Sequence, residues 1–250
     1  MWSNHINYYF VMRTHQLVLH WIEDRLSAGD LAVGGRLPAE RTLAEQLQVS
    51  RTSVREAIRI LEAMGVVRSG VGSGPDAGTV VISDPAAALG SALRLHVATQ
   101  HLPVADIVET RVLLESWAAA KARRDAPELA EAATLLSAMD TPEGLPARDF
   151  LALDVRFHLA LANAAGNAVV SAMMGSLRES IQGYAAELTG KLPDWNATAS
   201  RLHAEHHAIL AAIRKGDGGR AAQLVAAHIE GFYKEAGLGR DHPAQPGLIG

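Results

Sequence analysis

The 250-residue chain contains no cysteine. This absence excludes disulfide bonds, zinc sites built from thiolates and catalytic cysteines. Any metal ion must therefore be held by imidazole and carboxylate groups, and the eleven histidines supply enough imidazoles for such a site.

Long apolar runs and a targeting signal are also missing. No stretch reaches the roughly 18 consecutive apolar residues that indicate a transmembrane helix, and the N-terminus lacks the basic start and apolar core of a signal peptide. We therefore expect no membrane partner and a cytoplasmic protein. The composition, 48% hydrophobic and 20% charged, is typical of globular proteins, and the length allows two domains with separate cores.

Lysine is absent from residues 1–83, which hold eight arginines against eight acidic residues. The whole acidic excess behind the net charge of -4 lies in the rest of the chain. Any binding of nucleic acid by the first part must therefore rest on a few placed arginines, because a general basic field is lacking.

Residues 15–83 read as three helices followed by a hairpin. Apolar residues recur at helical spacing in 15–28, in 41–47 and in a longer segment that Ser50 caps and Gly65 ends. Two short β-branched runs around a glycine and proline turn then predict a β-hairpin over residues 66–82. Three helices and a hairpin form the plan of a winged helix-turn-helix.

Three arginines form a stripe along the third of these helices. Arg51, Arg55 and Arg59 are four residues apart, which places three guanidinium groups on one helical face. Alone, such a face favours solvated charges that pair with Glu56 and Glu62. Between a short second helix and a wing, the stripe instead indicates a helix that reads DNA, with Arg59 further along the helix than the reading positions.

Residues 85–238 show helical periodicity throughout and no comparable strand signal. Proline or glycine breaks separate seven segments of recurring apolar residues, at 85–101, 104–124, 127–139, 147–165, 168–189, 196–216 and 219–237. The sequence therefore predicts a mainly α protein, with a winged helix-turn-helix before an antiparallel bundle of about seven helices that can enclose a pocket.

Four motifs in this order resemble those of the GntR-type bacterial transcription regulators, in the branch named for the fatty-acid regulator, whose second domain is the all-helical FCD ligand-binding domain. They are LPAERTLAEQLQVSRTSVREAIRILEAMGVV, ETRVLLE, DVRFHLALANAAGN and EHHAILAAIRKGD, the last followed by a histidine at 228. The resemblance implies an N-terminal arm at 1–14, a DNA-binding domain at 15–83, an effector-binding domain at 84–238 and a tail at 239–250.

For the first domain, the resemblance implies contacts with double-stranded operator DNA. The implied residues are Arg41, Ser50, Arg51, Thr52, Ser53 and Arg55. Arginine can engage guanine in a bidentate fashion, and hydroxyls with helix N-terminal amides can hold phosphates. A minor-groove arginine contact from the wing is not expected, because its tip carries Asp76 and only Arg68 lies nearby.

For the second domain, the resemblance implies a metal site made of Asp154, His158, His206 and His228. The first two are four residues apart on one predicted helix, so they share a face. One carboxylate and three imidazoles suit a divalent Zn, Ni, Mn or Fe ion. His207 is the alternative to His206, since a rotation of one residue exchanges them.

The resemblance also implies a small carboxylate effector held by Arg111, with Asn163 as a second candidate. A guanidinium fork suits a carboxylate. Arg111 pairing with Glu115 or Glu109 is the equally favoured structural alternative. Asn167 is expected to cap a helix rather than bind a ligand.

The function expected is a ligand-responsive DNA-binding regulator, most simply a repressor, that acts as a homodimer joined through its helical domains because operators are read as two half-sites. No catalytic residue is predicted. The alternative is a metal-dependent enzyme that acts on small hydroxy or sugar acids, for which Glu205 beside His206 offers a general base.

Overall fold

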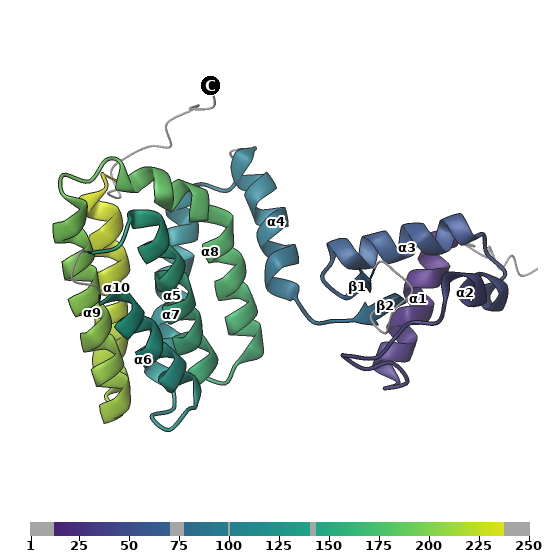
Figure 1. Ribbon diagram of the computed structural model, residues 1–250, viewed down its shortest axis with the longest axis horizontal. Helices are drawn as coiled ribbons and strands as arrows, with labels where there is room; N and C mark the ends of the chain where they lie inside the picture. Colours follow the sequence, from purple (N-terminus) through teal and green to yellow (C-terminus); the bar gives the residue numbers. More distant parts are fainter. Residues whose placement is uncertain (1–12, 71–77, 100, 141–143, 238–250) are drawn as a thin grey trace, which may run out of the picture. The chain divides into compact units, whose positions relative to one another are not determined.

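The computed structural model describes residues 13–70, 78–99, 101–140 and 144–237 (Figure 1). The chain divides into two compact units, Met1–Ala88 and Leu89–Gly250, whereas the sequence placed the boundary at residue 83. Most of the expected arm, the expected tail and the wing tip with Asp76 lie outside the described residues.

The first unit consists of three helices and a two-stranded antiparallel sheet. Its elements are α1 (Thr14–Ser27), α2 (Glu40–Leu47), α3 (Arg51–Ala63), β1 (Val67–Gly70) and β2 (Gly78–Val81). One apolar face of each helix and the inner ends of both strands form a common core. The core residues are Val18, Ile22, Leu37, Leu43, Ala44, Val54, Ala57, Ile58, Leu61, Val67 and Val81.

Local sequence sets the turn before α3 and the exit after it. Gln48 adopts a left-handed conformation that ends α2, and Ser50 then caps α3 by accepting a hydrogen bond from the Ser53 amide at 3.0 Å. Gly65 follows α3 with a φ of 68°, and a Cβ there would overlap the Asp84 carbonyl oxygen. Glycine is therefore required where the chain leaves α3.

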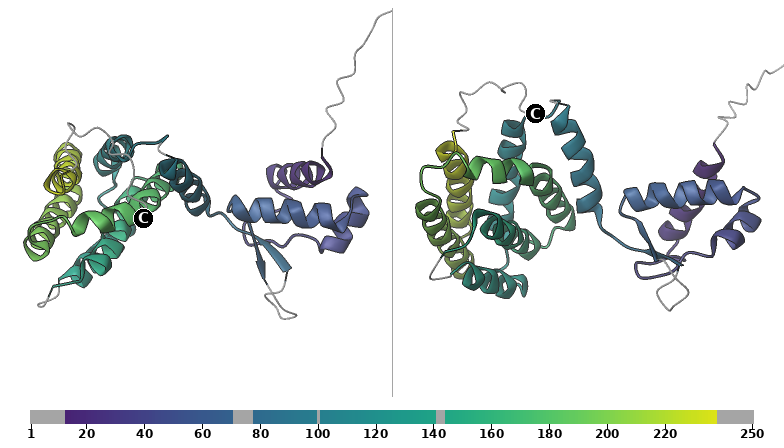
Figure 2. Two further views of the ribbon diagram at one scale, coloured as in Figure 1. Left: turned by 90° about the horizontal axis from the view of Figure 1, so that it is seen from above. Right: turned by 45° about the horizontal axis from the view of Figure 1, so that its top comes forward.

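The second unit is a helical bundle. Its elements are α4 (Pro85–Ala98), which begins in the first unit, then α5 (Val104–Lys121), α6 (Glu128–Met139), α7 (Ala147–Ala164), α8 (Ala168–Thr189), α9 (Trp195–Lys215) and α10 (Gly218–Glu235). The views of Figure 2 show α9 and α10 side by side, and α10 packs most extensively against α5. Asn167, Asp194 and Asp217 cap α8, α9 and α10 with their side chains. The structure thus confirms the predicted mainly α architecture, including a winged helix-turn-helix and, within the described residues, seven helices after it.

No helix in the described part of the chain is long and apolar enough to cross a membrane.

Candidate DNA-reading helix, metal centre and anion pocket

The exposed face of α3 carries the predicted reading residues. Arg51, Thr52 and Arg55 are all solvent-exposed in the first two turns, and Arg59 is exposed one turn later. The three guanidinium groups therefore lie on an accessible face of the helix, as DNA reading requires.

Glu40 of α2 holds the first two of these arginines. Its Oε2 accepts a hydrogen bond from Arg55 Nε at 2.8 Å and lies 3.9 Å from Arg51 Nη2. The alternative partners proposed from sequence are engaged elsewhere, since Glu56 pairs with His15 and Glu62 accepts from the Ser69 amide. Arg51 and Arg55 are therefore anchored across the helix-turn-helix rather than along their own helix.

Ser53 differs from the other predicted DNA contacts. Its side chain is buried, and its hydroxyl bonds to Thr14 Oγ1 at 2.7 Å and to Ser50 Oγ at 3.0 Å. Ser53 therefore ties α1 to the start of α3 instead of presenting a hydroxyl on the exposed face. Arg41, in contrast, is exposed on α2 and makes a long ion pair with Glu45 at 3.9 Å, so its side chain is accessible.

Asp154, His158, His206 and His228 come together inside the second unit. They come from α7, α9 and α10, and one ligand atom from each lies within 4.8 Å of all the others. His206 Nε2 is 3.0 Å from Asp154 Oδ1, and His228 Nε2 is 3.2 Å from the Nε2 atoms of both His158 and His206. His206 is completely buried.

Two glutamates orient the histidine rings. His158 Nδ1 lies 2.7 Å from Glu115 Oε2, and His228 Nδ1 lies 2.8 Å from Glu205 Oε2. An ionised carboxylate can only accept, so each Nδ1 donates its proton outwards and each Nε2 faces the centre of the cluster. Outer carboxylates of this kind are typical of histidines that bind metal.

Burial and neighbouring charges set the ionisation of the cluster. Burial, reinforced by His228, lowers the pKa of His206 to about 3, which leaves this imidazole neutral. Burial raises the pKa of Asp154, but His158 and Arg178 outweigh it and hold that pKa well below its usual range. Burial lowers the pKa of His228, but Asp154 and Glu205 outweigh it and raise that pKa, so a bound cation would have to displace any proton on this ring.

The donor set fits a divalent metal. The Nε2 atom of His228 lies 3.2 Å from the Nε2 atoms of His158 and His206, so each of these contacts needs a proton or a cation between the nitrogens. Within the described residues, the buried Nδ1 of His206 has no hydrogen-bond partner, so its ring is held by packing against Phe157 and Phe150. One carboxylate with three imidazoles matches the preferences of Zn, Ni, Mn or Fe.

The neighbouring histidines of α9 lie outside this cluster. His207 is exposed, and His203 Nε2 lies 3.3 Å from the carbonyl oxygen of Leu136. The geometry therefore favours His206 over the alternative His207.

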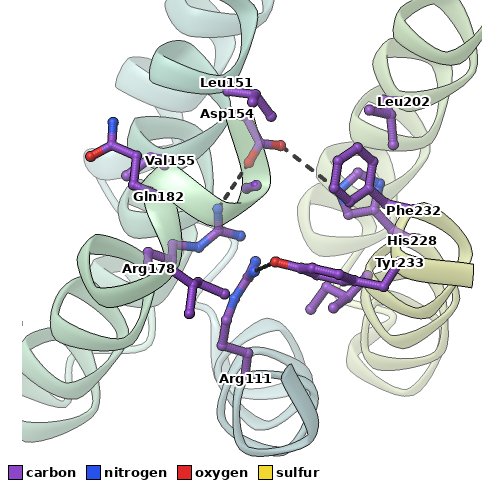
Figure 3. Close-up of a pocket in the computed structure, with 13 residues that line it drawn as sticks. Arg111, Leu151, Asp154, Val155, Arg178, Gln182, Leu202, His228, Phe232 and Tyr233 are labelled. Carbon is purple, nitrogen blue, oxygen red and sulfur yellow. Dashed lines mark hydrogen bonds and ion pairs between the residues drawn. The ribbon is translucent and has the colours of Figure 1, made fainter. Parts of the chain in front are cut away.

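A pocket opens directly onto the cluster (Figure 3). Its polar lining includes Arg111, Asp154, Arg178 and His228. Its other lining residues are Leu151, Val155, Ile181, Gln182, Ala185, Leu202, Ile229, Phe232 and Tyr233. Its volume is about 50 Å³, room for roughly four water molecules, so it suits a ligand of a few carbon atoms.

Two buried arginines face this pocket from different helices. Arg111 of α5 donates from Nε to Glu115 at 2.9 Å and from Nη1 to the Tyr233 hydroxyl at 2.9 Å. Arg178 of α8 donates to Asp154 Oδ2 at 2.9 Å and to Glu115 Oε2 at 2.8 Å. Among the described residues, the buried Nε of Arg178 has no partner, which leaves one donor available.

The arginines keep their carboxylate partners ionised. Burial raises the pKa of Glu115, but Arg178 and Arg111 outweigh this effect and hold the pKa well below its usual range. Arg111 therefore makes the pair with Glu115 that the structural alternative expected, and it also lines the pocket.

Sequence reasoning missed Arg178, Tyr233 and the central role of Glu115. The only sequence signal for Arg178 is that it is the single basic residue of α8. Asn163, proposed from sequence as an effector contact, is exposed and is not among the residues that line this pocket. It follows Asp154 by nine residues on α7, which is two and a half turns and places it on the opposite face.

Comparison with known proteins decides the family. The family model of the FCD domain matches residues 106–231. The family model of the bacterial regulatory proteins of the gntR family matches residues 14–75. The chain belongs to the GntR family. It is therefore a transcription regulator of the GntR type with an FCD domain, and the alternative of a metal-dependent enzyme is not retained, because this family and the relatives below are regulators.

Relatives of this GntR-family regulator align over most of its length. It is 30% identical to the HTH-type transcriptional regulator LutR of Bacillus subtilis, over 83% of this chain and 97% of the relative. It is also 30% identical to the "Putative L-lactate dehydrogenase operon regulatory protein" of Escherichia coli, over 80% of this chain and 77% of that one. The solved structure of Streptococcus agalactiae GntR covers 88% of the chain at 27% identity, with 98% of its own length matched and a TM-score of 0.62.

Proposed function

We propose that this regulator binds a small carboxylate beside a divalent metal in its FCD domain, and that this binding changes its affinity for operator DNA. The metal ligands are Asp154, His158, His206 and His228, and the ion is Zn, Ni, Mn or Fe. The observation that carries the proposal is a small pocket that two buried arginines share with the metal cluster. A guanidinium and a cation with open coordination positions both attract a carboxylate.

The names of relatives support an acidic effector. One E. coli relative is named for an L-lactate dehydrogenase operon, and lactate is a small hydroxy acid. The pocket admits a molecule of this size, and its apolar lining next to the arginines suits a short carbon chain. We therefore expect hydroxy acids of a few carbons to bind more tightly than large or uncharged molecules.

Replacing Arg111 by lysine should weaken binding of the acid. The lysine keeps the positive charge but loses the planar fork, so it cannot serve Glu115, Tyr233 and a ligand together. Loss of one hydrogen bond to a charged group costs about 1.5–3 kcal/mol, which corresponds to roughly a 10- to 150-fold weaker affinity in calorimetry.

Arg94→Lys is the matched control, because Arg94 pairs with Glu179 and does not line the pocket. If the Arg111→Lys protein binds the acid with wild-type affinity, Arg111 has a purely structural role.

On the DNA side, we propose that Arg51, Thr52 and Arg55 contact the operator from α3, with the Ser50 cap and Arg41 beside them and Ser53 supporting the helix from within. The exposed stripe that Glu40 anchors supports this assignment. Arginine contacts with guanine supply sequence discrimination, and hydroxyl contacts with phosphate supply register.

Two copies of the chain are proposed to pair through α5 and α8, which pack against each other. Leu113 and Trp117 on α5 are 67% and 40% exposed, and Val169 and Met173 on α8 are 71% and 36% exposed. Large exposed apolar side chains on two neighbouring helices are typical of a surface that binds another protein.

A dimer that covers both half-sites excludes other proteins from the same DNA, so we propose that it acts as a repressor.

Leu113→Asp should convert the dimer to a monomer. Burying a carboxylate without a partner costs several kcal/mol, and a twofold axis places it in the interface twice. Analytical ultracentrifugation measures the result, and Val33→Asp is the control, because Val33 is equally exposed in the first unit. A Leu113→Asp protein that stays dimeric would contradict this interface.

A further inference from the structure

We propose that Glu115 couples the metal centre to the anion pocket, so that metal and acid each strengthen the binding of the other. The inference rests on the proposed function, and it assigns the communication between the two sites to one buried carboxylate.

Glu115 is the only described residue that bonds to a metal-ligand candidate and to both pocket arginines. Its Oε2 accepts from His158 Nδ1 at 2.7 Å and from Arg178 Nη2 at 2.8 Å, and its Oε1 accepts from Arg111 Nε at 2.9 Å. Its side chain is 2% exposed, so little water screens these contacts. Three donors therefore share one negative charge.

Sharing of that charge supplies the coupling. When His158 binds a cation through Nε2, its Nδ1 proton becomes a stronger donor and draws more of the charge of Glu115 Oε2. Arg178 bonds to the same oxygen, and its second carboxylate, Asp154, is itself a metal ligand candidate. Both partners of Arg178 are then less able to neutralise it, and the arginine becomes a better site for the carboxylate of an acid.

The coupling must be reciprocal. An acid that engages Arg178 and Arg111 leaves more of the charge on Glu115 for His158, which makes that imidazole a more basic ligand. The affinity of the metal therefore rises by the same factor as the affinity of the acid.

Glu205 provides a matched comparison. It accepts from His228 Nδ1 at 2.8 Å, as Glu115 does from His158, but its other partner is Arg201 at 2.6 Å, which does not line the pocket. Glu205 thus orients a metal ligand without touching the arginines. A variant at 205 should affect metal affinity alone, whereas a variant at 115 should affect both metal affinity and coupling.

The test is calorimetry on the full chain with Zn²⁺ as the metal probe and acetate and L-lactate as acid probes. The coupling factor is the ratio of the Kd of the acid without Zn²⁺ to its Kd with Zn²⁺. We expect a factor of about 5 or more in the wild-type protein, because coupled sites typically differ by about 5- to 150-fold. Glu115→Gln should lower this factor, leaving only the part that direct attraction between the metal and the acid supplies, and it should weaken Zn²⁺ binding by about 10- to 100-fold.

Glu205→Gln should weaken Zn²⁺ binding to a similar extent and keep the wild-type coupling factor. Glu109→Gln, an exposed position on the same helix as Glu115, should change neither quantity. Glu115→Asp, which keeps the charge but retracts it by one methylene, serves if the glutamine variant does not fold, and it should also lower the coupling factor.

A folded variant at 115 that keeps the wild-type coupling factor would overturn the inference, and so would a wild-type factor of one with both probes bound. Failure of the wild-type protein to bind Zn²⁺ or either acid would instead contradict the proposed function, and the inference would fall with it.

Discussion

His206→Ala should purify without bound metal. His206 is completely buried, its Nε2 lies 3.0 Å from Asp154 Oδ1 and 3.2 Å from His228 Nε2, and removing it deletes one of four ligand atoms. The loss of affinity should exceed the roughly 10- to 100-fold expected when only an outer partner of a ligand is removed. Elemental analysis of the purified protein and competition with a chelator measure the effect.

His207→Ala is the matched control, because it removes an adjacent imidazole that is exposed and outside the cluster. It should retain full metal content. The opposite result, with metal kept by His206→Ala and lost by His207→Ala, would show that the assigned ligand is wrong by one residue.

Arg51→Ala should strongly weaken specific operator binding while leaving the fold intact. A bidentate contact between arginine and guanine contributes about 1–3 kcal/mol of discrimination. A dimer uses the contact twice, so affinity for the operator should fall by roughly 30-fold to more than 10⁴-fold. Arg51 is exposed, and its ion pair with Glu40 is long at 3.9 Å. Removing its side chain should therefore change the free energy of unfolding by no more than about 0.5 kcal/mol.

Footprinting and fluorescence anisotropy with the operator measure this loss. Arg59→Ala is the control, since it removes the same charge from the same helix two turns further on. It should weaken binding to all DNA sequences modestly and equally. An unaltered footprint for Arg51→Ala would contradict the reading role of α3.

Local sequence was sufficient to predict most of the fold. The Ser50 cap, the glycine after α3 and the periodicity of the later helices depend on neighbours within a few residues, so they are visible in a single chain. The convergence of Asp154, His158, His206 and His228 could also be predicted, because the first two share a helical face and the resemblance supplied the two distant histidines.

The features that were missed depend on contacts between distant residues. Ser53 is buried because α1 places Thr14 against it, a contact between residues 39 positions apart. Arg178 reaches Asp154 and Glu115 from another helix, and no spacing along the chain reveals these bonds. The hydrogen-bond network that joins the Asp154 and histidine cluster to the pocket therefore appeared only with the packing of α5, α7 and α8.

Control of DNA binding by metal and acid is the central claim. The most direct test is an operator titration by the full-length, Zn²⁺-loaded protein, with and without a saturating small carboxylate that calorimetry has shown to bind. The acid should change the operator Kd by at least about fivefold, and this change should disappear in the metal-free His206→Ala protein. Identical operator isotherms with and without the bound acid would contradict the account.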